Sequence, residues 1–201
     1  MTDLGIYGGT FAPVHNGHVR AAKVFFEEMH LDRLLVVPSR KPPHKVLCPG
    51  DDPLQRLRML HLAFDGEEGI EVSDYELFSG EPGYTALTLR HFASPDRRLF
   101  LLVGTDMFET LSTWYHPEVI FALSTVVHLR RTEPDAQALA REAELTAFYR
   151  ETYRGQVVHL PVPALPLSST GVRSAVREGK DISSLVPPKV ADYIGRMGLY
   201  R

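Results

Sequence analysis

The chain has 201 residues, of which 44% are hydrophobic and 23% are charged, and its formal net charge is -3. This composition is globular and excludes a disordered or fibrous protein, and the small negative charge argues against a broad electrostatic grip on DNA or RNA. No apolar run approaches the ~20 residues that a membrane-spanning helix needs.

Cys48 is the only cysteine, so the chain cannot form an internal disulfide. A reducing compartment therefore fits best. We expect a soluble, cytoplasmic protein that folds as one domain, residues 1–201, and that binds neither nucleic acid nor membrane.

Short apolar runs alternate with longer amphipathic stretches along the chain. Strands are expected at residues 4–7, 34–37, 70–73, 99–103, 126–129 and 157–160, of which 99–103 is the most apolar and is expected at the centre of the sheet. Helices are expected at about 17–29, 54–64, 85–92, 136–149, 169–179 and from 188 onward, with Thr85 capping one and Ser169 or Thr170 another. The prolines of residues 38–53 predict a long loop. The pattern predicts an α/β fold: a Rossmann-like doubly wound parallel sheet with helices on both faces and a small C-terminal helical region.

The first strand is followed by Gly-Gly-Thr-Phe-Ala-Pro-Val-His-Asn-Gly-His, residues 8–18, which leads into a helix. Open α/β folds bind phosphates at this place, because helix N-termini offer free N–H groups and a favourable dipole. Gly8, Gly9 and Gly17 would let a phosphate approach the backbone, and His15 and His18 are spaced to face the same anion. The spacing matches neither a P-loop nor a G-x-G-x-x-G fingerprint. The alternative is a glycine turn beside two ordinary histidines.

A second candidate site lies near the other end of the chain. Ser168, Ser169 and Thr170 place hydroxyl groups at a helix start, and Arg173 follows one turn later. Such a segment also predicts an anion site. The alternative is an ordinary helix cap followed by a surface arginine.

Further candidates follow the most apolar strand. Gly104 and Asp106 stand at a strand end where α/β folds place ligands, and an Asp there can accept hydrogen bonds from ribose hydroxyls. Trp114 and Tyr115 offer flat faces on which an aromatic ring could stack. A pair of core aromatic residues is the alternative.

Residues 8–18 resemble the signature of the nucleotidylyltransferase superfamily. Residues 42–45 (P-P-H-K), 84–89 (Y-T-A-L-T-L), 104–106 (G-T-D), 167–173 (L-S-S-T-G-V-R) and 198–201 (G-L-Y-R) are similar to segments of its bacterial nicotinate-nucleotide adenylyltransferases. One departure is Ala12, because that family usually carries Asp or Asn there. The resemblance covers the chain from the first strand to the last residue. It implies that residues 8–18 and 168–173 converge around a single polyphosphate.

The resemblance implies a set of site residues. Expected catalytic residues are His15, His18, Lys45 and Arg173; expected ATP contacts are Gly8, Gly9, Thr10, Phe11, His15, His18, Ser168, Ser169, Thr170 and Arg173; expected mononucleotide contacts are Tyr84, Thr85, Gly104, Asp106, Trp114, Tyr115 and Arg131. Thr85 is the candidate for the nicotinate carboxylate, and the resemblance implies that the basic pair Arg130-Arg131 assists in binding it.

The implied reaction is transfer of AMP from ATP to nicotinate mononucleotide in NAD biosynthesis, by direct in-line attack and with release of pyrophosphate. Mg²⁺ is expected to arrive with ATP, since the sequence shows no dedicated carboxylate cage for it. The alternatives are another superfamily transferase, acting on nicotinamide mononucleotide, phosphopantetheine or a cytidylyl substrate, and a non-catalytic nucleotide sensor. A metal hydrolase is disfavoured, because the histidines are scattered and no H-E-x-x-H motif is present. The oligomeric state, a homo-oligomer included, stays open.

Overall fold

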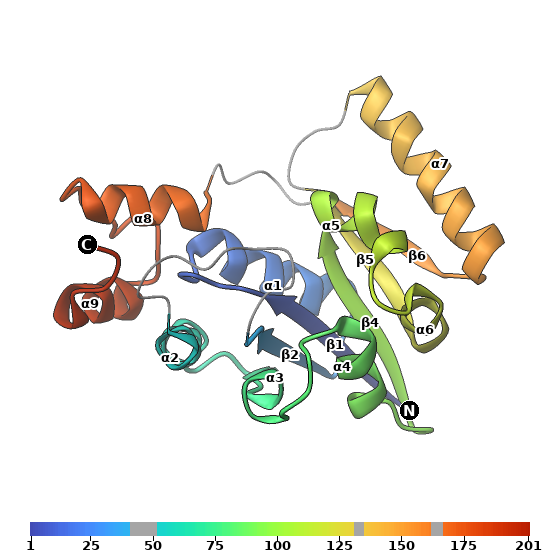
Figure 1. Ribbon diagram of the computed structural model, residues 1–201, viewed down its shortest axis with the longest axis horizontal. Coiled ribbons are helices and arrows are strands. Elements are labelled where there is room, and N and C mark those ends of the chain that lie inside the picture. The colour runs from blue at the N-terminus through green and yellow to red at the C-terminus, as the bar shows by residue number, and fades with distance from the viewer. Residues whose placement is uncertain (41–51, 131–134, 162–166) are drawn as a thin grey trace.

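The computed structural model describes residues 1–40, 52–130, 135–161 and 167–201. Its described part contains a six-stranded sheet in the order β3-β2-β1-β4-β5-β6, with every neighbouring pair parallel (Figure 1). The strands are β1 (Thr2–Gly9), β2 (Arg33–Pro38), β3 (Ile70–Val72), β4 (Arg97–Gly104), β5 (Ser124–Arg130) and β6 (Val157–Pro161). The order is that of a doubly wound sheet, and β4 lies between β1 and β5. The predicted fold class and the central place of residues 99–103 are confirmed.

Helices connect the strands and cover both faces of the sheet. They are α1 (Asn16–Glu28), α2 (Pro53–Ala63), α3 (Tyr75–Phe78), α4 (Thr85–Phe92), α5 (Thr105–Thr110), α6 (Pro117–Leu123), α7 (Ala136–Tyr153), α8 (Ser169–Arg177) and α9 (Pro188–Met197), with a 3₁₀ turn η1 (Leu111–Thr113). Helices α8 and α9 lie together near the C-terminus (Figure 1). Helix α7 lies at the opposite end of the molecule from them (Figure 1). No helix of the described residues is long and apolar enough to span a bilayer.

Alternate residues of each strand enter two separate hydrophobic clusters. Leu34 and Val36 of β2 pack into the cluster beneath α1, α2, α8 and α9, whereas Leu35 and Val37 pack into the cluster beneath α4, α5, α6 and α7. Side chains on a strand alternate between its two faces, so both faces must be covered. The near-continuous apolar runs in the sequence have this origin.

The structure corrects the sequence-based expectation at several element ends. The N-cap of α4 is Tyr84, and Thr85 is its first helical residue. The N-cap of α8 is Ser168, whose hydroxyl accepts a hydrogen bond from the Gly171 N–H at 3.0 Å. Helices α3, α5 and α6 were not predicted, because segments of four to seven residues are too short to show a helical period.

Candidate functional site

The site lies where the chain reverses its direction of travel across the sheet. Strands β1 and β4 are neighbours, yet the chain continues from β1 toward β2 and from β4 toward β5. Their carboxyl ends therefore border one crevice, which is where open α/β sheets bind ligands. The loop of residues 8–18 leaves β1 there, and Gly104 ends β4 beside it.

Helix α8 contacts this loop directly. The Ser169 hydroxyl donates to the Pro13 carbonyl oxygen at 2.9 Å, and Arg173 Nη1 donates to the Ala12 carbonyl oxygen at 2.6 Å. These bonds join residues 156 and 161 positions apart. The prediction that the two distant segments converge is confirmed.

The two histidines of the loop lie against each other at the start of α1. His15 is buried, and its ring stacks on that of His18 with centroids 3.6 Å apart. The backbone N–H of His15 donates to His18 Nδ1 at 3.2 Å. A ring nitrogen that accepts a hydrogen bond is unprotonated, so this bond assigns the proton of neutral His18 to Nε2. Nε2–H is therefore the donor side of the His18 ring.

The glycines of the loop have different roles from those expected. A Cβ on Gly8 would meet no atom within 4 Å, so Gly8 leaves open space beside the backbone. A Cβ on Gly9 would lie 2.8 Å from the Phe11 ring, and one on Gly17 would lie 3.0 Å from the His15 ring. Only Gly8 therefore fits the expectation that a missing side chain admits a phosphate; the other two make room for neighbouring rings.

Phe11 supports the loop from within. Phe11 has a φ of 51° and a buried ring that packs edge-on against Tyr7 and His18. A left-handed backbone at a bulky residue is strained and is held by its surroundings. The buried ring leaves only the Phe11 backbone for a contact with ATP, and that contact stays a prediction.

Arg56 is a site residue that the sequence analysis missed. It is fully buried on α2, and its guanidinium donates to the carbonyl oxygens of Thr10 at 2.8 Å, Ser39 at 2.7 Å and Arg40 at 3.2 Å. It thus holds the end of β1 to the end of β2 and puts a cation beneath the loop.

The positions of the buried residues along α2 could have indicated that Arg56 is buried. Leu54, used to predict the helix, is 54% exposed, whereas Met59, Leu60 and Ala63 form the buried face. Arg56 lies three and four positions before Met59 and Leu60, which is the same side of a helix. A charged residue in line with a core stripe indicates a buried role.

Arg173 also contacts Thr170 of its own helix and keeps donors for a ligand. Its Nη2 donates to the Thr170 hydroxyl at 3.1 Å, and its buried Nε has no hydrogen-bond partner among the described residues. A guanidinium carries five N–H donors, so Arg173 can hold the Ala12 carbonyl and still donate to a bound anion. Lys45, the other predicted cation, lies outside the described residues.

The aromatic surface near the site is built differently from the expectation. Tyr115 is 45% exposed and stacks on Tyr84, with ring centroids 4.4 Å apart, whereas Trp114 is partly buried against the core. Tyr84 and Tyr115 thus form the flat face that had been assigned to Trp114 and Tyr115. Thr85 follows Tyr84 in the first turn of α4, as a helix-start contact requires.

Asp106 lies in the first turn of α5, directly after Gly104, and it is exposed. No described residue binds its carboxylate, so it can accept hydrogen bonds from a ligand. Arg130 is engaged elsewhere, since its guanidinium binds Glu142 of α7 through two nitrogens. Arg131 lies outside the described residues.

A buried carboxyl group supports the start of α4. The Thr88 hydroxyl donates to Glu76 Oε1 at 2.7 Å, and burial raises the pKa of Glu76 above its ordinary value. An acid with a raised native pKa stabilises the fold below its unfolded pKa, and this contribution is lost as the pH rises through the native pKa.

We expect Glu76→Gln to remove that part of the pH dependence. The melting temperature of the variant, relative to the native chain, should rise as the pH increases from about 4 to 8. Thermal unfolding across this range measures the difference, and Glu28→Gln, at an exposed glutamate, is the matched control. A parallel pair of curves for Glu76→Gln and the native chain would contradict the assignment.

The comparisons with known proteins agree with this geometry. The cytidylyltransferase-like family model matches residues 6–175. A protein of Desulfatibacillum aliphaticivorans, named probable nicotinate-nucleotide adenylyltransferase, is 36% identical over 98% of this chain and 99% of its own length. A protein of the same name from Thermomicrobium roseum is 37% identical over 100% of this chain and 92% of its own length.

Solved structures show the same fold. The Plasmodium falciparum nicotinic acid mononucleotide adenylyltransferase complexed with NaAD superposes with a TM-score of 0.76, at 19% identity, over 100% of this chain and 98% of that one. A second structure of that protein, complexed with APC, has a TM-score of 0.74. The likeness extends over the whole chain.

Proposed function

Because this chain belongs to the cytidylyltransferase-like family, we propose that it transfers AMP from ATP to nicotinate mononucleotide, forming nicotinate adenine dinucleotide and pyrophosphate in NAD biosynthesis. The observation that carries the proposal is the direct contact of Ser169 and Arg173 with the loop at Pro13 and Ala12. That contact assembles two phosphate-binding segments at the sheet crevice. The single cysteine allows no internal disulfide, which fits a reaction in the reducing cytoplasm.

ATP would bind with its phosphates between the loop and α8. His18 offers Nε2–H, Arg173 offers its remaining N–H groups, and the exposed Thr170 lies at the start of α8. The mononucleotide phosphate then attacks the α-phosphorus in line with the leaving pyrophosphate. It is already ionised, so the reaction needs no general base, and catalysis rests on placing two anions and stabilising developing charge.

The acceptor would lie on the β4 side of the crevice. Tyr84 and Tyr115 supply an aromatic face for the pyridine ring, Thr85 a hydrogen-bonding group for the carboxylate, and Asp106 an acceptor for ribose hydroxyls. Lys45 and Arg131 carry over from the family resemblance as further cations. Binding nicotinate in preference to nicotinamide would follow from a positive environment around the carboxylate.

Mg²⁺ would enter with ATP. The described groups that meet between the loop and α8 are imidazoles, hydroxyls and a guanidinium, which bind phosphate oxygens and not a hard cation. These groups therefore fit a Mg²⁺ ion that is bound by the phosphates of ATP and not by the protein. When bound, it supplies additional screening of the triphosphate charge.

The direct test is to incubate the full chain with ATP, Mg²⁺ and one acceptor at a time, and to measure pyrophosphate and the dinucleotide product. We expect kcat/KM to be highest with nicotinate mononucleotide. Higher kcat/KM with nicotinamide mononucleotide or phosphopantetheine would reassign the acceptor. Binding of ATP without pyrophosphate release from any acceptor would support a nucleotide sensor and overturn the proposal.

A further inference from the structure

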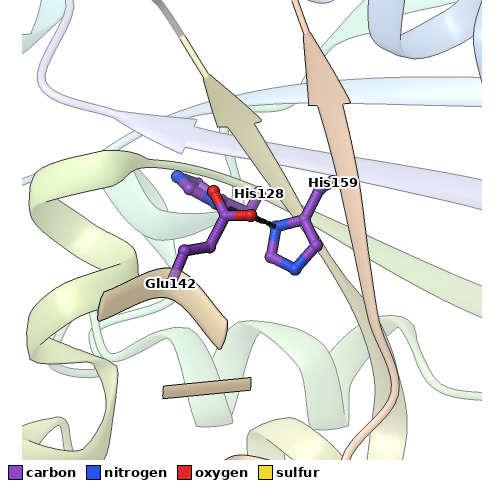
Figure 2. A group of neighbouring side chains, drawn as sticks. All are labelled: His128, Glu142 and His159. Carbon is purple, nitrogen blue, oxygen red and sulfur yellow. Dashed lines mark hydrogen bonds and ion pairs between the residues drawn. The ribbon is translucent and has the colours of Figure 1, made fainter. Parts of the chain in front are cut away.

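A second cluster of reactive side chains lies away from the phosphate site. His128 of β5, Glu142 of α7 and His159 of β6 converge between the sheet and α7, and the Glu142 carboxylate points toward both imidazole rings (Figure 2). His128 is buried, and the other two are largely buried. Nothing in the proposed reaction uses this cluster.

The donor atoms lie close together, and each imidazole Nδ1 faces a different oxygen of the Glu142 carboxylate. The two Nδ1 atoms are 3.1 Å apart, His128 Nδ1 lies 3.3 Å from Glu142 Oε2, and His159 Nδ1 lies 3.2 Å from Glu142 Oε1. A tetrahedral zinc ion bound at about 2.0–2.1 Å separates its ligand atoms by about 3.3–3.4 Å. The three separations in this cluster are close to that value.

The outer nitrogens of both rings are already engaged. His128 Nε2 lies 3.1 Å from the Thr105 hydroxyl, and His159 Nε2 lies 3.1 Å from the Thr146 hydroxyl. Histidines that bind metals commonly donate their second N–H in this way, which fixes the tautomer. Protons on Nε2 would leave both Nδ1 lone pairs directed at the centre of the cluster.

The cluster holds two imidazoles and one carboxylate, and Arg130 of β5 also binds that carboxylate through two nitrogens. Burial lowers the pKa of His128 to about 4 and also lowers that of His159, so both imidazoles are neutral near pH 7. Burial opposes ionisation of Glu142 most strongly, but the hydrogen bond from Arg130, together with the nearby charges of Arg130 and the two histidines, keeps the Glu142 pKa below its ordinary value. Neutral imidazoles and a hydrogen-bonded carboxylate are the forms that bind metal.

An approach path is present. A cavity of about 430 Å³ beside α7 is lined by Glu142, Thr146 and His159 among others. An ion and a water molecule as fourth ligand can enter from this side. Two nitrogen donors favour zinc or a similar transition metal over Mg²⁺, which prefers oxygen ligands.

We propose that His128, Glu142 and His159 form a Zn²⁺ site that joins α7 to β5 and β6. The site is separate from any Mg²⁺ carried by ATP and does not depend on the proposed reaction. Through Thr105, whose hydroxyl lies within hydrogen-bond distance of His128 Nε2, it connects to the turn that carries Asp106.

The test is titration of the metal-free full chain with zinc chloride, without nucleotide or Mg²⁺, by calorimetry. We expect one equivalent to bind tightly and to raise the melting temperature. Cobalt chloride should give the intense visible absorption of a tetrahedral site. His159→Asn and Glu142→Gln should each weaken zinc binding at least about 100-fold, since even the loss of a residue that only hydrogen-bonds to a metal ligand costs about 10- to 100-fold.

His61→Ala, at an exposed histidine on α2, is the matched control and should bind zinc as the native chain does. Equal zinc affinity in the native chain, His159→Asn and Glu142→Gln would overturn the proposal. So would a folded native chain that binds neither zinc nor cobalt in a tetrahedral site. The native-chain measurements decide the question even if a variant fails to fold.

Discussion

Replacing His18 with alanine is expected to lower kcat by roughly 10² to 10³, the usual cost of losing one donor that stabilises developing charge. The His15 N–H holds the Nδ1 side of the ring, so Nε2–H is the donor that alanine removes. Pyrophosphate release at saturating ATP and acceptor measures the effect. Near-normal kcat would remove His18 from the catalytic machinery.

Two further substitutions separate catalysis from helix capping at His18. Asparagine can still accept a hydrogen bond from the His15 N–H but has no donor at the Nε2 position, whereas glutamine can place an amide N–H near it. We expect His18→Asn to recover stability without recovering kcat, and His18→Gln to recover part of kcat. His61→Ala should behave as the native chain. Recovery of kcat by asparagine would assign His18 a capping role alone.

The second large effect is expected at Arg56. Arg56→Ala leaves the carbonyl oxygens of Thr10, Ser39 and Arg40 without their buried donor. A buried group left unsatisfied costs about 1–3 kcal/mol, so the free energy of unfolding should fall by about 3 kcal/mol or more. Urea denaturation measures this loss.

Arg58→Ala is the matched control, because Arg58 lies on the same helix and is exposed. It should change the free energy of unfolding by no more than about 0.5 kcal/mol. Activity of folded Arg56→Ala should also fall, since the loop before α1 loses its support from below. A loss for Arg56→Ala no greater than that for Arg58→Ala would show that other donors satisfy these carbonyls.

The sequence was sufficient for the sheet and for the meeting of the two phosphate-binding segments. Apolar runs such as 99–103 are long enough to show buried strands, and parallel strands bring their carboxyl ends to one edge. The residue pattern at 168–173 also indicated a helix start, although the cap is Ser168 and not Ser169 or Thr170. Neighbouring hydroxyl residues compete for that position, and only the backbone geometry decides between them.

Other contacts between distant segments could not be predicted from the sequence. The pairing of Tyr84 with Tyr115 and the contacts of Arg56 depend on loop paths that no local period encodes. The cluster of His128, Glu142 and His159 comes from three separate elements. In the sequence its histidines are 31 residues apart, which matches no metal-binding motif, so they were judged scattered.

The hydrogen bonds from α8 to Ala12 and Pro13 have a consequence for the order in which the enzyme matures. Ribosomes synthesise the glycine loop first, but its partners on α8 emerge only after more than 150 further residues. Contacts of such sequence separation form late and slowly. A nascent chain can therefore build much of its sheet before the proposed triphosphate site is complete.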